Sequence, residues 1–301
     1  MLILFYRKLV RTKFSFYDQL NIDNITDILP SDVTITYDRS LLPIADAVVF
    51  NVPLLNSYLE EDIEKPEGQL WVGWSYESEV NYPWIFAEEL KELFDIWMTY
   101  HLNSDVVLPY YDYTFLEKLY SPVTPKTNNV CMFISSPFNK SARQEYLSEL
   151  MNYIDIDSYG SWKRNKIIND DKGYTTKLDI IKKYKFSIAF ENAVSKDYVT
   201  EKFFEPLLMS SVPIYFGAPN IEQFSPGKNS YINVRDFNSP KELADCIKKY
   251  CENTALYNNL LQWKSKPLNL SLKNLITDQK IHPFVRLANI IRLTNLIKKQ
   301  K

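Results

Sequence analysis

The second half of the chain alternates short apolar runs with amphipathic helical ones, and this alternation constrains the fold more than any other feature. Three runs are typical of buried strands: NNVCMFISS (128–136), FSIAFEN (186–192) and VPIYFG (212–217). Two stretches with helical spacing lie between them: ARQEYLSELMNYI (142–154) and TEKFFEPLLMSS (200–211). Strands that alternate with helices are joined by right-handed crossovers, so we predict a doubly wound parallel sheet.

The first half is less regular but of the same kind. Its strand-like stretches are LILFY, DVTITYD, DAVVFN and QLWVGWSY. The segment SPVTPKTNN (121–129) has two prolines among polar residues and is the best linker candidate. We therefore expect domains at 1–124 and 125–280, followed by a C-terminal helical segment, 281–301. The predicted fold class is α/β, with two Rossmann-like doubly wound domains facing a cleft, because ligands of such sheets bind beyond the C-terminal strand ends.

Composition and charge exclude several classes of protein. Apolar residues make up 46% of the 301 residues and charged residues 24%, which indicates a globular chain. A net charge of −2 offers no basic face, so no nucleic-acid partner is expected. Only two histidines argue against a histidine-rich zinc site. The three cysteines form no CxxC pair, and no stretch has the length of a membrane helix, so we expect a cytoplasmic protein.

A polar cluster, YVTEK, lies where the strand 186–192 should hand over to the next helix. It contains Tyr198, Thr200, Glu201 and Lys202. A helix N-terminus presents unpaired N–H groups and the positive end of the helix dipole, to which Lys202 adds a full charge. The cluster suits a nucleotide-sugar, with Glu201 accepting from hydroxyl groups. The alternative is structural: Thr200 caps the helix, Glu201 favours its dipole and Lys202 is solvated.

Known phosphate-binding and metal-binding signatures are missing or weak. The sequence has neither GxxxxGK[ST] nor GxGxxG, which removes support for P-loop enzymes and dinucleotide oxidoreductases. Asp155-Ile156-Asp157 resembles a metal-binding DxD, but its place in a short strand before a turn favours a structural role. We therefore expect neither a metal ion nor a cofactor.

Longer motifs carry a resemblance to a known family. Residues 186–237 contain F-x4-EN, YVTEK, VPIYFG and P-x3-SYI in order, and this stretch resembles the α-1,3-fucosyltransferase motif of glycosyltransferase family 10. Three upstream segments are similar to the family as well: VTITYDRSLLPIADAVVFN (33–51), WVGWSYESE (71–79) and WMTYHLNSDVVLPY (97–110). The resemblance covers roughly residues 33 to 250 and leaves the last fifty uncovered.

This resemblance implies a fold, a reaction and a set of site residues. The family has a GT-B fold and transfers L-fucose from GDP-β-L-fucose with inversion; the donor binds in the C-terminal half and the acceptor mainly in the N-terminal half. On that basis Glu77 matches the general base, Arg143 and Lys202 contact the diphosphate, and Glu201 binds donor hydroxyls. The remaining donor-site positions are Glu191, Asn192 and Tyr198. The expected product is an α-1,3 linkage to GlcNAc in an N-acetyllactosamine-type acceptor.

Four positions depart from the family pattern and leave alternatives open. Glu79 stands where many members have proline, His101 where many have arginine, and Ser136 and Asn103 where asparagine and aspartate are common. These changes spare the proposed catalytic groups but concern the acceptor. The alternatives are a 1,4 linkage, another acceptor sugar, or a glycan-binding relative without catalysis.

The C-terminal stretch FVRLANIIRLTNLIKKQK (284–301) has apolar residues at helical spacing and cations between and after them. We expect its apolar stripe, which includes Ile290, to pack on the protein. The alternative is a basic amphipathic helix that lies on the anionic inner face of a membrane.

Overall fold

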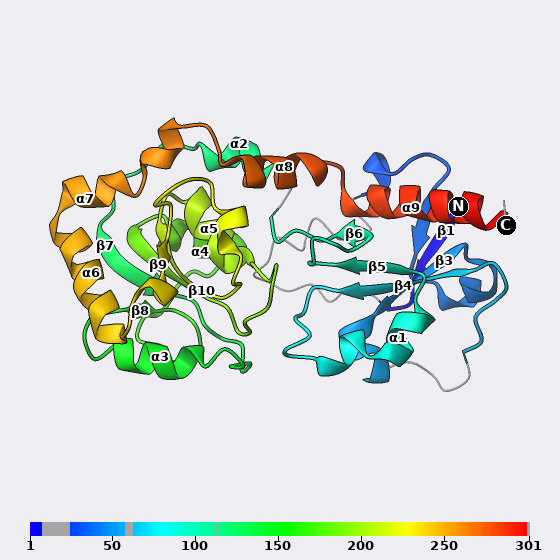
Figure 1. Ribbon diagram of the computed structural model, residues 1–301, viewed down its shortest axis with the longest axis horizontal. Coiled ribbons are helices and arrows are strands. Elements are labelled where there is room, and N and C mark those ends of the chain that lie inside the picture. Colours follow the sequence, from blue (N-terminus) through cyan, green and yellow to red (C-terminus); the bar gives the residue numbers. More distant parts are fainter. Residues whose placement is uncertain (8–24, 58–62, 112–113, 300–301) are drawn as a thin grey trace. The chain divides into compact units, whose positions relative to one another are not determined.

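The computed structural model describes residues 1–7, 25–57, 63–111 and 114–299, which form two compact α/β units (Figure 1). One unit holds the described residues through Pro109 together with those from Gln279 onward. The other runs from Tyr110 to Asp278. The predicted boundary at 124/125 thus falls inside the second unit, because helix α2 (Phe115–Leu119) packs there against helix α5 (Glu201–Leu208).

Aromatic side chains explain why α2 belongs to the second unit. Phe115 and Tyr111 both contact Phe204 of α5 edge-on, with ring centroids 5.4 and 5.0 Å apart. Burial of such rings is a large apolar contribution to stability. The second unit therefore begins ahead of the segment that prolines and polar residues mark as a linker.

The first unit contains a parallel sheet with the strand order β2-β1-β3-β4-β5-β6. Its strands are β1 (Leu2–Phe5), β2 (Thr34–Thr36), β3 (Ala47–Asn51), β4 (Leu70–Ser75), β5 (Ile96–Thr99) and β6 (Val106–Val107). Both central strands, β3 and β4, are buried along almost their whole length, as expected for a parallel sheet covered on both faces. The short helix α1 (Glu88–Leu93) precedes β5.

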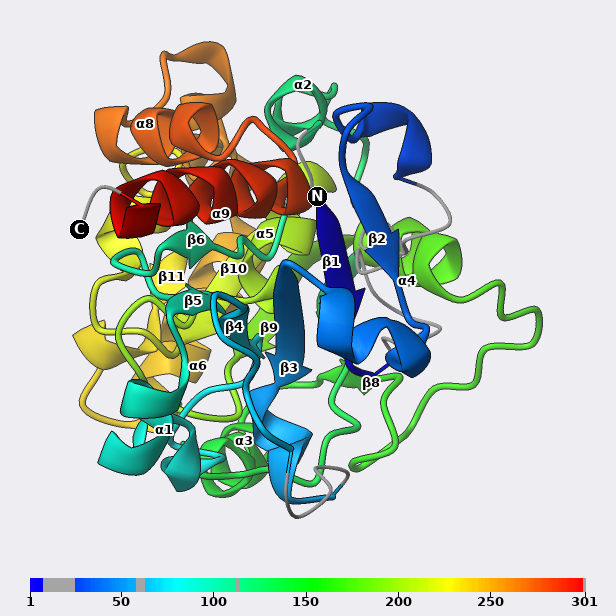
Figure 2. The same cartoon turned by 90° about the vertical axis from the view of Figure 1, so that its right-hand side faces the viewer.

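Helix α9 (Pro283–Lys299) belongs to the first unit and lies beside β6 (Figure 2). Phe284, Leu287, Ala288 and Ile291 are fully buried, which confirms packing on the protein for the first half of the stripe. Ile290 itself is only half-buried, and the apolar side chains near the end of the helix stay exposed: Leu293, Leu296 and Ile297. Among the described residues, no helix combines the length and the hydrophobicity that a membrane-spanning segment requires.

Ion pairs fix the polar side of α9 to the same unit. Arg292 pairs with Asp32 at 2.6 Å, and Lys298 pairs with Asp95 at 2.9 Å. Arg286 donates to the carbonyl of Val107 at 2.6 Å. The segment 281–301, which we delimited from the two predicted domains as a C-terminal helical segment, is thus built into the first unit in its described part.

The second unit contains a parallel sheet with the strand order β11-β10-β9-β7-β8. Its strands are β7 (Asn128–Met132), β8 (Asp157–Ser158), β9 (Tyr184–Phe190), β10 (Val212–Phe216) and β11 (Ile232–Asn233). Besides α2 and α5, its helices are α3 (Arg143–Leu150), α4 (Tyr174–Ile181), α6 (Pro240–Glu252), α7 (Thr254–Asn259) and α8 (Leu270–Asp278). If these five strands are numbered 1 to 5 in chain order, their order across the sheet, starting from β8, is 2-1-3-4-5. This is the flavodoxin-like form of a doubly wound sheet.

This strand order places a switch point between β7 and β9, where successive connections leave in opposite directions. Ligands of such sheets bind beyond the carboxyl ends of the strands that flank the switch point. The predicted doubly wound α/β class is confirmed for both sheets, and in the second unit it directs attention to the residues after β7 and β9.

Candidate functional site

A pocket of about 410 Å³ opens at the carboxyl ends of β7 and β8, within the second unit. We call it the switch-point pocket. It is lined by Phe133, Ile134, Ser135, Ser136, Arg143, Tyr159, Gly160, Arg164, Lys166, Ile167, Ile168, Asp171, Gly173, Lys177, Glu201 and Lys202. Five of these residues are cations and two are acids, so the pocket suits an anionic ligand.

One wall of the pocket depends on close backbone packing. A Cβ atom at Gly160 would lie 2.1 Å from the carbonyl oxygen of Ile134, so only glycine permits this approach. The amide of Trp162 donates to the same oxygen at 2.9 Å. Beside this contact the rings of Phe133 and Tyr159 stack, with centroids 5.2 Å apart and an interplanar angle of 13°.

The start of α5 is held by a buried carboxylate. Thr200 is the N-cap residue, and its side-chain oxygen accepts from the amide of Lys202. The carboxylate of Glu191, at the end of β9, accepts from the amide and the hydroxyl of Thr200, both at 2.8 Å. Glu191 is fully buried and is absent from the pocket lining. It therefore anchors the helix start from behind and does not line the pocket.

Gly217 makes room for this anchor. A Cβ atom at Gly217 would lie 2.5 Å from Cγ of Glu191 and 2.5 Å from the hydroxyl of Tyr215. The glycine that ends the VPIYFG strand thus has a packing role beneath the site.

Lys202 is surrounded by acceptors. Its Nζ lies 2.9 Å from Oγ1 of Thr200, 3.1 Å from Oε1 of Glu201 and 3.4 Å from Oε2 of Glu191. Burial lowers the pKa of Lys202, but the two carboxylates outweigh burial and raise it above its ordinary value. The ammonium therefore stays charged while one side of it lines the pocket, as the polar-cluster hypothesis requires.

Glu201 is ionised for the complementary reason. Burial by itself raises its pKa, but Lys202 and Lys177 outweigh burial and lower that pKa to about 2. Glu201 thus lines the pocket as a pure hydrogen-bond acceptor, which is what a ligand hydroxyl needs.

Arg143 is the first residue of α3 and only 1% exposed, yet it lines the pocket. Its Nη1 donates to the carbonyl of Phe190 at 2.9 Å, and its Nη2 donates to the carbonyl of Phe138 at 3.2 Å. Its Nε is buried and has no hydrogen-bond partner among the residues that the structure describes. Arg143 therefore ties the end of β9 to the loop that follows β7 and has a spare donor.

Two further predicted donor residues are buried outside the pocket lining. Asn192 is 6% exposed, and its carbonyl accepts from the amide of Ser141 at 3.1 Å. Tyr198 is 3% exposed and meets Tyr110 edge-on, with centroids 5.9 Å apart. Of the donor-site residues predicted from the sequence, the structure thus brings Arg143, Glu201 and Lys202 together around one pocket.

Sequence reasoning missed a second buried ion pair at this site. Lys177 of α4 and Glu205 of α5 approach to 2.5 Å between Nζ and Oε2, with side chains 13% and 3% exposed. Glu205 follows Glu201 by one helical turn, so its side chain lies on the same face of α5. That spacing was visible in TEKFFEP. Lys177 is the single lysine of α4, but no motif in the sequence marked it.

Glu77 lies in the first unit, directly after β4. Its amide donates to Oγ of Ser75 at 3.0 Å, and that hydroxyl donates to the carbonyl of Glu77 at 2.9 Å. The two bonds form a tight turn that fixes the backbone of Glu77 at the carboxyl end of the strand. Burial raises the pKa of the nearby Tyr82, and the charge of Glu77 raises it further.

Two of the departures from the family pattern meet in the structure. Nε2 of His101 lies 3.4 Å from Oε2 of Glu79, and the hydroxyl of Tyr100 donates to the same oxygen. The ring of His101 also packs on Phe86, with centroids 5.4 Å apart. Glu79, two residues beyond Glu77, and His101, two residues beyond the end of β5, are therefore a matched pair.

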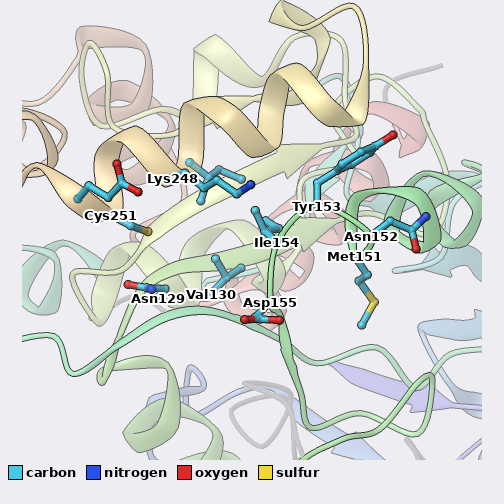
Figure 3. A pocket seen from close by; sticks show the side chains of 11 residues that line it. Asn129, Val130, Met151, Asn152, Tyr153, Ile154, Asp155, Lys248 and Cys251 are labelled. Atoms are coloured by element: carbon cyan, nitrogen blue, oxygen red, sulfur yellow. The ribbon is translucent and has the colours of Figure 1, made fainter.

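Asp155 and Asp157 have separate surroundings. Asp157 accepts from the hydroxyl of Tyr184 at 2.6 Å and pairs with Lys166 at 3.2 Å. Asp155 lines a different pocket of about 390 Å³, at the amino end of β7 (Figure 3). Within the described ranges, no three His, Cys, Asp or Glu side chains converge as a metal site would require. This arrangement is consistent with the structural role that we predicted for the DxD.

Comparison with known proteins gives a consistent set of relatives. Residues 123–299 match Glycosyltransferase family 10 (fucosyltransferase) C-term, and residues 1–111 match Fucosyltransferase, N-terminal. Alpha-(1,3)-fucosyltransferase B of Drosophila melanogaster is 34% identical over 269 residues, which are 82% of this chain and 59% of that protein. GDP-fucose protein O-fucosyltransferase 3 of Xenopus tropicalis is 43% identical over 148 residues, 46% of this chain and 31% of that protein.

A solved structure shows the same fold. The crystal structure of alpha1,3-fucosyltransferase with GDP-fucose superposes with a TM-score of 0.64 at 17% identity, and the alignment covers 98% of this chain and 89% of that one. At this identity the likeness concerns the fold alone. A fucosyltransferase-like protein of Arabidopsis thaliana is 37% identical over 242 residues, 79% of this chain and 45% of that protein. The chain thus spans about half the length of these curated relatives. Since the family match covers more than half of its residues, the chain belongs to glycosyltransferase family 10, the fucosyltransferases.

Proposed function

We propose that this protein transfers L-fucose from GDP-β-L-fucose to a hydroxyl group of an acceptor. The observation that carries the proposal is the switch-point pocket of a family 10 chain, in which Arg143, Glu201 and Lys202 come together. A diphosphate joined to a sugar presents both anionic oxygens and hydroxyls. Cations beside an ionised carboxylate match those two kinds of group in one ligand.

In the proposed donor complex, Lys202 faces the diphosphate. Its ammonium is anchored by Glu191 and Thr200, so little reorganisation is needed when phosphate oxygens arrive. The buried Nε of Arg143 supplies a further charged donor at the pocket wall. Glu201, ionised and 20% exposed, accepts from donor hydroxyls.

The proposed reaction is a single displacement at the anomeric carbon of fucose. Glu77 removes the proton of the acceptor hydroxyl, the new glycosidic C–O bond forms, and the bond to the β-phosphate oxygen breaks. The electron pair leaves with GDP, and Lys202 and Arg143 stabilise the charge that develops there. One displacement inverts the anomeric configuration. The five cations of the pocket provide the charge for this step, and we propose that no divalent metal is needed.

For the acceptor, we propose the 3-hydroxyl of GlcNAc in an N-acetyllactosamine-type glycan. A second candidate, a serine or threonine hydroxyl of a protein, is favoured by a specific observation. Relatives that are 43% and 42% identical over 46% and 42% of this chain are named GDP-fucose protein O-fucosyltransferase 3. The Glu79–His101 pair beside Glu77 is where this chain departs from the α-1,3 pattern, so it bears on the same choice.

A GDP-release assay separates these possibilities. GDP-fucose is offered alone and with N-acetyllactosamine, with its β1,3-linked isomer, or with a glycan-free polypeptide rich in serine and threonine. Release stimulated by N-acetyllactosamine, with a fucosylated product at O3 by mass spectrometry and NMR, is the expected result. Stimulation by the polypeptide alone would move the assignment to protein O-fucosylation. Binding of GDP-fucose without release under any acceptor would indicate a glycan-binding relative instead.

A further inference from the structure

We propose that Lys177 is a third cation for the donor diphosphate, and that Glu205, its ion-pair partner in this structure, takes up a proton from solvent when Lys177 turns to the phosphates. This inference rests on the proposed function and adds to it a residue and a linkage to pH. It concerns the buried ion pair that neither the sequence motifs nor the proposed chemistry uses.

The position of Lys177 supports the first part. Its Nζ lies 2.5 Å from Oε2 of Glu205, yet Lys177 also lines the switch-point pocket, whereas Glu205 does not. The lysine therefore has a carboxylate behind it and ligand space in front of it. The charge of Lys177 already acts on the pocket, since it helps to lower the pKa of Glu201.

The balance of charge around α5 supports the second part. Three cations, Arg143, Lys177 and Lys202, lie among three carboxylates, Glu191, Glu201 and Glu205. These six charges cancel, and of the other cations in the lining Lys166 is paired with Asp157, so a diphosphate that lies beside α5 adds negative charge to a buried region whose own charges are balanced. Such a region responds by neutralising its least stabilised charged group.

Glu205 is the carboxylate with the weakest support. Glu191 accepts two hydrogen bonds from Thr200 in addition to facing Lys202. Glu201 lies beside Lys202, its hydrogen-bond partner. Glu205 has a single ion-pair partner in the part of the chain that the structure describes, namely Lys177. If Lys177 turns to the phosphates, the Glu205 carboxylate is left buried without a counterion.

The direction of the pKa agrees with this geometry. Burial raises the pKa of Glu205 to about 7, although the charge of Lys177 on α4 lowers it. Among the charges on α5 itself, Glu201 raises this pKa and Lys202 lowers it. Removing Lys177 and adding phosphate charge both raise it further. Above pH 7, binding therefore converts an ionised Glu205 into a protonated one. At pH 6 the carboxyl is already protonated, so binding changes little.

Isothermal titration calorimetry with GDP-fucose tests this linkage in the wild-type protein. Titrations in two buffers of different ionisation enthalpy give the number of protons taken up. GDP-fucose is a suitable probe because its diphosphate has no group that titrates near neutrality. We expect uptake of roughly 0.9 proton per GDP-fucose at pH 8 and roughly 0.1 at pH 6, with a Kd about tenfold weaker at pH 8.

Three variants assign the effect. Glu205→Gln should bind GDP-fucose with no proton uptake and with a Kd independent of pH between 6 and 8. Lys177→Met should bind more weakly than wild type at pH 6 and also lose the pH dependence. Glu252→Gln, an exposed glutamate of the other pocket, is the matched control and should titrate like wild type.

Several outcomes would overturn the inference. Binding to wild type without proton uptake at pH 8 would do so by itself, even if Glu205→Gln failed to fold. Uptake that is equal in wild type and Glu205→Gln would assign the proton elsewhere, and a wild-type Kd in Lys177→Met would remove the third cation. Absence of GDP-fucose binding to wild type at either pH is a different result, because it contradicts the proposed function as well.

Discussion

Two pockets lie at opposite ends of strand β7, and they differ in charge much more than in size. The switch-point pocket, after β7, measures about 410 Å³ and has five cations and two acids in its lining. The pocket at the amino end of β7 measures about 390 Å³ and has one cation, Lys248, with Asp155 and Glu252 (Figure 3). Volume therefore does not separate the two. The two pockets differ in the number of charged side chains in their lining, and in the switch-point pocket several of these are buried and paired.

The physical reason lies in the direction of the strands. At the carboxyl ends of a parallel sheet, each strand leads into a loop and then a helix N-terminus, which places polar side chains and free N–H groups at one edge. Glu191, Thr200 and Lys202 follow β9 in this way. The other edge receives the ends of helices, such as α6, whose Ile247 and Cys251 line the second pocket. The comparison predicts that catalysis is confined to the edge at the carboxyl ends of the strands.

Replacing one lysine in each pocket with alanine should give the largest difference in fucosyl transfer between two variants. Lys202→Ala should reduce kcat/KM for fucosyl transfer by about 30- to 1000-fold, the equivalent of roughly 2–4 kcal/mol for loss of one preorganised charge. Lys248→Ala, which removes the cation of the other pocket, should leave transfer unchanged. Steady-state kinetics with melting temperatures for both variants check this. Full activity in Lys202→Ala would contradict the prediction that the switch-point pocket binds the donor.

Glu77 provides a second contrast, because it lies in the first unit and in neither pocket. Glu77→Gln should lower kcat by roughly a hundredfold or more, since a base that assists proton transfer is removed. The Kd for GDP-fucose, measured by calorimetry, should stay at its wild-type value. An equal loss of GDP-fucose affinity would identify Glu77 as a donor ligand.

Metal removal should have the smallest effect. If the cations of the switch-point pocket carry the diphosphate charge, transfer in EDTA should stay within about twofold of the untreated rate. Asp155→Asn, in the other pocket, should be equally silent. A rate that falls to background in EDTA and returns with Mn²⁺ would show that the cationic pocket is insufficient alone.

Much of the fold could be predicted because parallel sheets leave a strong pattern. The runs at 186–192 and 212–217 correspond to β9 and β10, and the alternation with helices predicted a doubly wound parallel sheet. The domain boundary could not be predicted in the same way. It depends on Phe115 and Tyr111 packing on Phe204, a contact between residues far apart in the sequence.

The site shows the same limit at the level of single residues. Arg143, Glu201 and Lys202 were predicted because they fall in ordered motifs, and they do line one pocket. Motifs do not reveal which side of a backbone a residue occupies, so Glu191 was expected in the donor site but lies behind Thr200. Lys177 is the single lysine of α4 and falls in no motif, and only the tertiary packing of α4 on α5 pairs it with Glu205.

Hydrogen–deuterium exchange of the wild-type protein, with and without GDP-fucose, tests most directly where the donor binds. A bound ligand slows exchange in segments whose local opening it opposes. We predict protection in residues 135–143 and 192–204, which follow the two switch-point strands, and unchanged exchange in residues 151–155 and 247–252 around the other pocket. Protection of 151–155 and 247–252, with 135–143 and 192–204 unchanged, would contradict the assignment of the donor to the switch-point pocket.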